Sequence, residues 1–325
     1  MRISPILGAL SLSAFVALIG CAREASTEGP LVVFNAGSLA RPIRAALDTF
    51  ARREGVRVEQ ESAGSLESAR KLTELGKIPD LIALADAEVF PGYLMPSHVD
   101  SYVRFARNRM VLAYTERSRH ADEITSENWW EVLQRAGVEV GRSDPELDPN
   151  GYRTLMVWQL TERAKGSPGL AARLEATAPL RNVRSKEADL IGLLEAGEFD
   201  YIWSYESMAR VLGLRWVALG DSVDLAAPGL AAFYDQAVVS VRGASGGAPV
   251  TFRGQPIVYA FAVPRDAPHR ALGERFAAFL LSAEGRAILR REGLDALDAP
   301  DAPPVVHAPE SVPDSVPESV LESVP

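Results

Sequence analysis

The feature that most constrains the fold of this chain is a regular alternation of strand-like and helix-like segments. Strand-like runs at 31–35, 56–61 and 81–84 are separated by stretches with apolar residues at helical spacing. This order favours an α/β fold with doubly wound parallel sheets, in which ligands bind beyond the carboxyl ends of the strands. Binding residues are therefore expected where strands end and helices begin.

The same tetrapeptide occurs at two of these strand-to-helix junctions. Residues 36–39 and 63–66 both read Ala-Gly-Ser-Leu. Each copy places a serine, Ser38 or Ser65, and free backbone N–H groups at the positive end of a helix, where anions bind. Because these residue types are common and serine is an ordinary N-cap, the repeat alone favours plain helix capping over ligand binding.

Length and charge narrow the class of protein. A chain of 325 residues can hold two domains, and its composition, with 47% hydrophobic residues, is typical of globular proteins. The net charge of −9 argues against a nucleic-acid partner, which requires a basic surface. An anionic ligand would have to be attracted by local dipoles rather than by the overall charge.

The two ends of the chain differ from its body. Residues 1–20 carry Arg2 and an apolar run too short to span a bilayer, which predicts a signal peptide. This segment resembles a bacterial lipoprotein signal, in which Cys21, the only cysteine of the chain, is lipidated and becomes the mature N-terminus. We expect residues 21–30 to form a tether. Residues 297–325 are predicted to be a disordered tail, because they are acidic and proline-rich.

Catalytic motifs are weak. Residues 243–247 match the Gly-x-Ser-x-Gly pattern of serine hydrolases, but that motif requires a helix directly after Ser245, and Ala-Pro-Val-Thr follows instead. We interpret this stretch as a hairpin loop. The four histidines share no metal-ligand spacing, and no phosphate-loop or dinucleotide pattern occurs. The sequence favours a protein that is not an enzyme and needs no cofactor; a hydrolase that uses Ser245 is the alternative from another class.

Several short motifs form an ordered series through the body of the chain. They resemble, in order and separation, the tungstate/molybdate-binding proteins of ABC importers, and the resemblance covers residues 31–296. The motifs are Phe-Asn-Ala-Gly-Ser-Leu at 34–39, Glu-Ser-Ala-Gly-Ser at 61–65, Lys-Leu-Thr-Glu-Leu at 71–75, Asn-Arg-Met-Val-Leu-Ala-Tyr-Thr at 108–115, Asp-Pro-Asn-Gly-Tyr-Arg at 148–153, Pro-Ile-Val-Tyr at 256–259 and Phe-Leu-Leu-Ser-Ala-Glu-Gly at 279–285.

The resemblance implies the two-lobed α/β fold of type II periplasmic binding proteins, in which two crossover strands join the lobes and a hinge motion closes them on the ligand. Lobe I would comprise 31–107 plus 265–296, and lobe II 108–264. Residues 110–114 and 257–263 are the candidate crossovers. We expect a monomer that delivers its anion to an ABC permease.

The resemblance also implies the binding residues. Ser38 and Ser65 would donate hydrogen bonds to the oxyanion from lobe I, and Asp148 would bond the metal centre directly from lobe II. Molybdenum and tungsten can expand their coordination beyond four oxygens, whereas the sulfur of sulfate cannot, so Asp148 would provide selectivity. The alternative is that Asp148 is only a cap or turn residue before Pro149.

One position departs from the family pattern. The family often places a second glutamate directly before Tyr205, where this chain has Ser204. If the backbone is extended there, Glu206 points the same way as Ser204 and could substitute; if a helix has begun, it cannot. Alternatively, Ser204 donates to a tetrahedral oxyanion, which would weaken discrimination against smaller anions. A further alternative keeps the fold but changes the ligand to sulfate, phosphate or a small organic anion. Tyr205 and Tyr259 are further candidates near the cleft.

Overall fold

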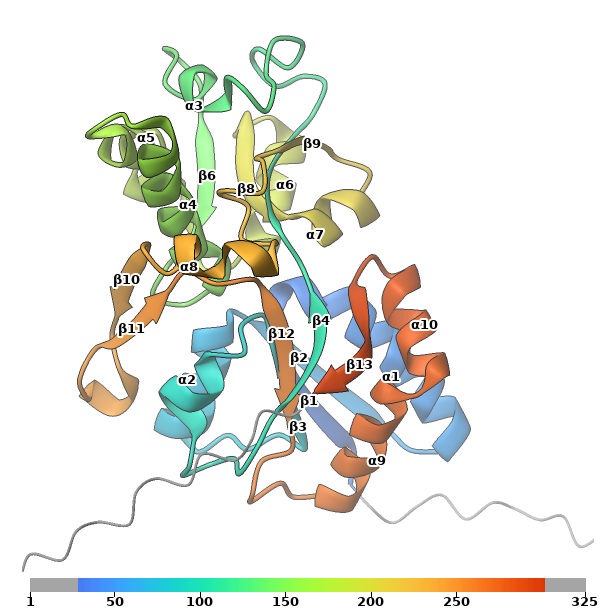
Figure 1. Ribbon diagram of the computed structural model, residues 1–325. Helices are drawn as coiled ribbons and strands as arrows, with labels where there is room; N and C mark the ends of the chain where they lie inside the picture. Colours follow the sequence, from blue (N-terminus) through green and yellow to red (C-terminus); the bar gives the residue numbers. More distant parts are fainter. Residues whose placement is uncertain (1–28, 302–325) are drawn as a thin grey trace, which may run out of the picture.

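The structure is a computed structural model that describes residues 29–301. The predicted signal peptide, Cys21 with most of the tether, and the tail beyond residue 301 lie outside the described residues. The described chain forms two lobes, each built on its own β-sheet (Figure 1). Within residues 29–301, no helix is both long enough and apolar enough to cross a membrane.

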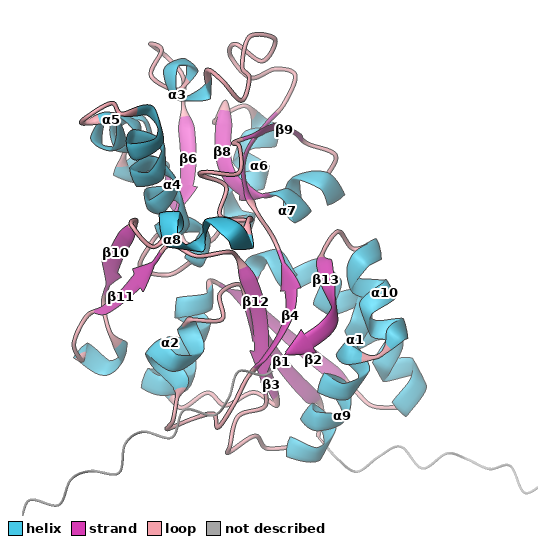
Figure 2. Cartoon of the chain, viewed as in Figure 1, coloured by secondary structure: helices cyan, strands magenta, loops and turns pink. Residues whose placement is uncertain are grey.

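Lobe I is built on a six-stranded sheet with the strand order β13-β4-β12-β3-β1-β2. Strand β1 pairs in parallel with both β2 and β3, as expected for a doubly wound sheet, and β12 is antiparallel to β3 and β4. Helices surround this sheet (Figure 2). The elements are β1 (Leu31–Ala36), α1 (Ala40–Glu54), β2 (Val58–Ala63), α2 (Ser65–Leu75), β3 (Leu81–Leu84), β4 (Val103–Arg107), β12 (Val258–Ala262), α9 (Arg270–Leu281), α10 (Ala283–Arg291) and β13 (Asp295–Asp301).

Lobe II is built on a five-stranded sheet with the order β7-β6-β8-β5-β9. Its central strand β8 is parallel to β6 and antiparallel to β5. The two α/β sheets confirm the predicted fold class. The elements are β5 (Met110–Tyr114), α3 (Trp129–Val132), β6 (Val140–Ser143), α4 (Pro149–Lys165), α5 (Leu170–Thr177), β7 (Val183–Arg184), α6 (Ala188–Ala196), β8 (Tyr201–Tyr205), α7 (Glu206–Val211) and β9 (Arg215–Ala218).

The chain passes between the lobes at two places. Asn108 and Arg109 join β4 of the first sheet to β5 of the second, so the first crossing precedes the expected range 110–114. The return crossing precedes β12, which pairs only with strands of the first sheet. The expected end of lobe II at residue 264 therefore differs from the sheet pairing. Strand β13 likewise extends to Asp301, into the range assigned to the tail.

Local sequence explains where the two helices nearest the lobe boundary begin and end. Helix α2 ends at Gly76, which adopts a left-handed conformation (φ 63°) that glycine accepts without strain. Helix α4 begins at Pro149, because Asp148 caps its first turn and proline suits the first helical position. The Asp-Pro-Asn-Gly-Tyr-Arg motif is thus a helix start rather than a loop.

A hairpin extends from lobe II to lobe I. Strands β10 (Val238–Val241) and β11 (Val250–Arg253) pair antiparallel, and the short helix η5 (Ala244–Gly246) between them packs against α2 (Figure 1). The backbone N–H of Ser245 donates to the Glu74 carboxylate at 3.0 Å. The predicted hairpin is confirmed, and its tip contacts the other lobe. The remaining short helices are η1 (Gly37–Leu39), η2 (Phe90–Leu94), η3 (Leu180–Asn182), η4 (Pro228–Leu230) and α8 (Ala231–Tyr234).

Candidate functional site

The two repeated serines lie at the same edge of the first sheet. Ser38 follows β1 and Ser65 follows β2, and these strands run parallel. The Ser38 hydroxyl lies 3.0 Å from the Tyr259 hydroxyl, and the Ser65 hydroxyl accepts a hydrogen bond from the backbone N–H of Ala85 at 3.0 Å. Both serines are buried, and neither is the residue that caps its helix. Plain capping, which the repeat alone favoured, is therefore not their role.

Lobe II lies directly against both Gly-Ser junctions. A Cβ atom on Gly37 would be 3.5 Å from the side chain of Lys186, whereas a Cβ atom on Gly64 would be 2.2 Å from the carbonyl oxygen of Leu147. The Leu147 carbonyl also accepts hydrogen bonds from the N–H groups of Leu66 and Glu67, at 3.1 and 3.2 Å. The structure is thus closed, and part of the expected free N-terminus of α2 is occupied by lobe II.

Asp148 caps helix α4 and is itself buried. It is 5% exposed; Oδ1 accepts from the Asn150 N–H at 3.2 Å and Oδ2 from the Glu187 N–H at 2.7 Å. Burial raises the pKa of Asp148 to about 6, although these two hydrogen bonds oppose the shift. Asp148 therefore caps α4, as one interpretation expected, and it also lies close to the Gly-Ser junction at Gly64.

Glu187 is a buried carboxylate that is not among the binding residues predicted from the sequence. It is 1% exposed, and Oε1 accepts hydrogen bonds from the Ser204 hydroxyl at 2.6 Å and from the Tyr205 N–H at 2.7 Å. Oε2 is buried without a hydrogen-bond partner among the described residues. Burial, with a smaller contribution from Asp148, raises the pKa of Glu187 to about 8. Glu187 lies between strand β7 and helix α6, and this strand-to-helix position is the sequence feature that could have identified it.

Two tyrosines line the same region. The rings of Tyr205 and Tyr259 meet edge to face, with centroids 5.8 Å apart. Arg153 donates to the Tyr205 hydroxyl at 2.8 Å, and Asn108 donates to the Tyr259 hydroxyl at 3.0 Å. Burial raises the pKa of both tyrosines, and the neighbouring Glu187 raises that of Tyr259 further. Both hydroxyls therefore stay neutral. The two tyrosines predicted near the cleft thus flank Glu187 and Ser38.

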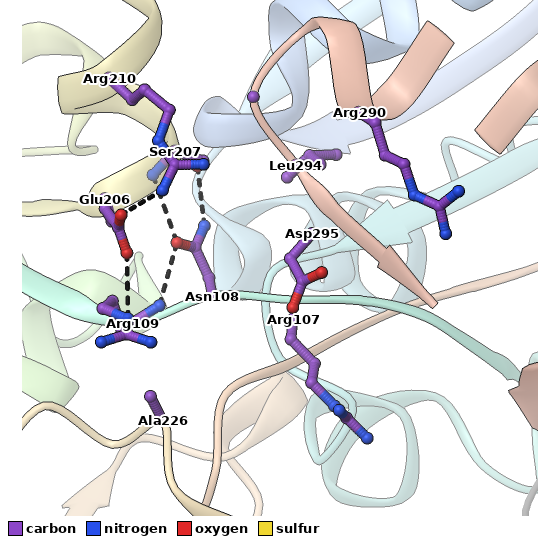
Figure 3. A pocket seen from close by; sticks show the side chains of 11 residues that line it. Arg107, Asn108, Arg109, Glu206, Ser207, Arg210, Ala226, Arg290, Leu294 and Asp295 are labelled. Atoms are coloured by element: carbon purple, nitrogen blue, oxygen red, sulfur yellow. Dashed lines mark hydrogen bonds and ion pairs between the residues drawn. The ribbon is translucent and has the colours of Figure 1, made fainter. Parts of the chain in front are cut away.

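Glu206 lies elsewhere. Helix α7 begins at Glu206, so the extended backbone that would let this residue replace a glutamate at 204 is absent. The Glu206 carboxylate instead pairs with Arg109 at 3.0 Å and with Arg210 (Figure 3). It lines a cavity of about 710 Å³ that Asn108 and Ser207 also line. The sequence-based suggestion of Glu206 as a substitute ligand is not supported.

A buried polar cluster holds the two lobes together beside the site. Asp86, directly beyond β3 of lobe I, forms an ion pair with Arg153 of α4 at 2.9 Å and accepts a hydrogen bond from Tyr152. Arg153 also donates to the Ala85 carbonyl at 2.8 Å. These side chains are all buried. The Tyr-Arg end of the motif at 148–153 therefore joins lobe II to lobe I.

The surroundings of Ser245 do not form a hydrolase elbow. Strand β11, not a helix, is the next long element after Ser245, and the Ser245 N–H is bonded to Glu74. Among residues 29–301, no group of three or more His, Cys, Asp or Glu side chains is placed to hold a metal ion. The buried residues described above include the serines Ser38 and Ser65, the tyrosines Tyr205 and Tyr259, and the carboxylates Asp148 and Glu187.

Comparisons with known proteins agree with this description. The molybdate/tungstate-binding protein WtpA of Pyrococcus abyssi is 35% identical over 324 residues, covering 90% of this chain and 93% of that protein. The fold is shared with the sulfate-binding protein SubI of Mycobacterium tuberculosis (TM-score 0.58, 15% identity, 83% and 88% of the two chains). It is also shared with the periplasmic molybdate-binding protein of Azotobacter vinelandii (TM-score 0.53, 17% identity, 81% and 98%).

Residues 31–295 match the family model described as bacterial extracellular solute-binding protein. Its members and the named relatives are binding proteins, which confirms that the chain is not an enzyme. In the named relatives the oxyanion is the bound solute rather than a cofactor. The two-lobed fold and the match over nearly the whole described chain lead to one conclusion: this protein belongs to the bacterial extracellular solute-binding protein family.

Proposed function

We propose that this protein is the lipid-anchored, extracytoplasmic binding component of an ABC importer, and that it captures tungstate or molybdate. The observation that carries the proposal is Asp148, a buried carboxylate whose backbone lies against Gly64 at the second Gly-Ser junction. The molybdate/tungstate-binding protein of Pyrococcus abyssi, 35% identical to this chain, supports the same ligands.

The chemistry of the cleft distinguishes among oxyanions. The hydroxyls of Ser38 and Ser65 would donate hydrogen bonds to anion oxygens, as any sulfate or molybdate site requires. A buried carboxylate such as Asp148 would repel sulfate, since sulfur offers no further coordination position. Molybdenum or tungsten can accept a lone pair from that carboxylate, which turns the repulsion into a bond.

The closed form implies how the solute would be loaded and released. Ser38, Ser65 and Asp148 are at most 5% exposed, so a solute can enter only when the lobes separate. The connections at Asn108–Arg109 and before β12 are the points about which the lobes would turn. A lipid on Cys21 would keep the protein beside its permease; no contact with the permease is assigned to particular residues.

The test is ligand-induced stabilisation of the purified protein. Melting temperature is measured with millimolar tungstate, molybdate, sulfate and phosphate in separate samples. A ligand at about a thousand times its dissociation constant adds roughly 4 kcal/mol to the free energy of unfolding. We expect stabilisation by tungstate and molybdate; stabilisation by neither would overturn the proposal. Stabilisation only by sulfate, phosphate or a small organic anion would establish the alternative ligand that Ser204 leaves open.

A further inference from the structure

We propose that Arg70 is a positioning residue that holds the hairpin of β10 and β11 and the segment before Asp148 against lobe I, and that it thereby sets how slowly a bound solute is released. Arg70 lies on α2, and its guanidinium donates to two backbone carbonyls of lobe II at once. The inference rests on the proposed function only in its choice of tungstate as the probe.

The Arg70 side chain is buried at the boundary between the lobes. It is 5% exposed; Nη1 donates to the Glu146 carbonyl oxygen at 2.5 Å and Nη2 to the Arg242 carbonyl oxygen at 2.6 Å. Both acceptors belong to lobe II, 76 and 172 residues further along the chain. Because both are backbone atoms of the other lobe, these bonds form only when the lobes are together.

Tyr93 of lobe I supports the same contact. The Arg70 guanidinium lies over the Tyr93 ring, 5.6 Å from its centroid, and Nη2 also donates to the Tyr93 hydroxyl at 3.3 Å. That hydroxyl in turn donates to the Arg242 carbonyl oxygen. One lobe II carbonyl thus accepts from two side chains of lobe I.

Two carboxylates balance the buried charge, one from each lobe. Arg70 Nε lies 3.9 Å from the Glu74 carboxylate of its own helix, and Nη2 lies 3.6 Å from the Glu146 carboxylate. The same carboxylates accept backbone N–H groups of the hairpin: Glu146 from Arg242 at 2.9 Å, and Glu74 from Ser245 at 3.0 Å. These residues form one contact between the lobes, with the guanidinium at its centre.

The hairpin of β10 and β11 is attached to lobe II at its base. The side-chain amide of Gln159, on α4, donates to the Val238 carbonyl at 3.0 Å and accepts from the Val238 N–H at 2.9 Å. The Phe252 ring stacks on the ring of Tyr152, also on α4, with centroids 4.6 Å apart. The hairpin therefore moves with lobe II, and its tip reaches α2 of lobe I (Figure 1).

The position of these bonds predicts a kinetic effect. In an open form, Arg70 and its two carbonyl acceptors belong to separated lobes, so the capture of a solute does not use them. Release requires the lobes to part, which breaks both charge-assisted bonds. Arg70 should therefore slow release without changing the rate of capture. Its hydrogen-bond partners are not among the residues proposed to bind the anion, so the preference among anions should not change.

The experiment uses the complete protein and four variants, Arg70→Met, Arg70→Lys, Tyr93→Phe and Arg44→Met. Methionine keeps an apolar stem in the place of Arg70 but donates no hydrogen bond. Arg44→Met is the matched control, because the Arg44 side chain donates to Asp48 on its own helix, at 2.9 Å from Nε. The melting temperature of each ligand-free variant checks folding.

Two measurements separate positioning from folding. Association and dissociation rates of tungstate are measured by stopped-flow tryptophan fluorescence. Hydrogen exchange is measured with tungstate bound, at the backbone N–H groups of Leu66, Glu67 and Ser245, because these donate across the lobe boundary and report closure.

We expect Arg70→Met to raise the dissociation rate at least about tenfold, as the loss of hydrogen bonds from a charged group implies, and to leave the association rate unchanged. Exchange at the three reporter N–H groups should become faster. Arg70→Lys should release tungstate at an intermediate rate, because an ammonium lacks the planar fork that reaches two carbonyls. Tyr93→Phe should have a smaller effect, since Arg70 still donates to the same carbonyl, and Arg44→Met should behave as the unmodified protein.

Two different failures can be told apart. Absence of tungstate and molybdate binding in the unmodified protein would refute the proposed function, and the rates would then be measured with sulfate or phosphate, whichever stabilises the protein. An unchanged dissociation rate in Arg70→Met, or slower capture in place of faster release, would refute the role of Arg70. Release from Arg44→Met as fast as from Arg70→Met would also overturn it.

Discussion

Oδ2 of Asp148 accepts a hydrogen bond from the backbone N–H of Glu187 at 2.7 Å. This bond links the segment after β6 to the segment after β7 and brings two buried carboxylates together. The two segments lie against the two copies of the Ala-Gly-Ser-Leu motif, with Lys186 and Ala188 at Gly37 and Leu147 at Gly64. Each repeat on one lobe therefore faces one carboxylate-bearing segment on the other.

Asp148→Asn separates the capping and ligand roles of this residue. Asparagine caps helices as well as aspartate does, so the melting temperature of the ligand-free protein should change little. The amide cannot replace the carboxylate at a metal centre, so preference for tungstate and molybdate over sulfate should be lost. Calorimetric titration with each anion measures this, and an unchanged preference would leave Asp148 as a cap alone.

The two repeat glycines provide a matched pair of substitutions. Gly64→Ala would place a methyl group 2.2 Å from the Leu147 carbonyl oxygen in the closed form, whereas Gly37→Ala would make only ordinary contacts of 3.5 Å and more. Overpacking of this kind costs about 1–3 kcal/mol. We expect Gly64→Ala to weaken the binding of every anion by about that energy, which corresponds to roughly tenfold or more in affinity. Gly37→Ala should bind nearly normally; equal affinities would contradict the closed geometry.

The buried ion pair between Asp86 and Arg153 should control closure rather than selectivity. Asp86→Asn leaves the Arg153 guanidinium buried without its counter-charge, and breaking such pairs costs roughly 3–5 kcal/mol. Since the pair joins the two lobes, the cost falls on the closed form. We expect affinities for tungstate and molybdate to fall by similar factors, and small-angle scattering to show a more open molecule with ligand. A change of preference between these anions would contradict this role.

The two carboxyls predict how stability depends on pH in the ligand-free protein. Burial raises the pKa of Asp148 to about 6 and that of Glu187 to about 8, above the values near 4 of unfolded chains. Their ionisation therefore costs folding free energy, and the cost is absent below about pH 4 and complete above about pH 8. One unit of pKa corresponds to about 1.4 kcal/mol, so the larger shift, that of Glu187, contributes more to this cost than the shift of Asp148.

Glu187→Gln isolates the larger of these contributions. The variant should gain stability relative to the unmodified protein as pH rises from 5 to 8, because the unmodified protein must ionise a buried carboxyl. Urea denaturation at several pH values measures the difference in free energy of unfolding. A difference that does not change with pH would show that Glu187 has an ordinary pKa in the folded protein.

The parts of the fold that depend on local pattern could be predicted. Strand β3 matches its predicted range. Helix α2 ends at Gly76, and the break between α9 and α10 falls at Ser282, where the hydroxyl accepts from the Gly285 N–H. Each of these follows from side-chain spacing or from a cap within a few residues. The start of α4 at Pro149 likewise follows from its cap, Asp148.

The sequence by itself determined the α/β class, the placement of Ser38, Ser65 and Asp148 at strand-to-helix junctions, and the absence of a hydrolase elbow, and its resemblance to a known family implied the two lobes. Only the tertiary structure decided which carboxylate stands beside Ser204. Glu206 is two residues away in the chain but faces Arg109, whereas Glu187 is 17 residues away and bonds the serine. Sheet pairing and the start of α7 direct these side chains, and both depend on contacts between distant segments rather than on local pattern.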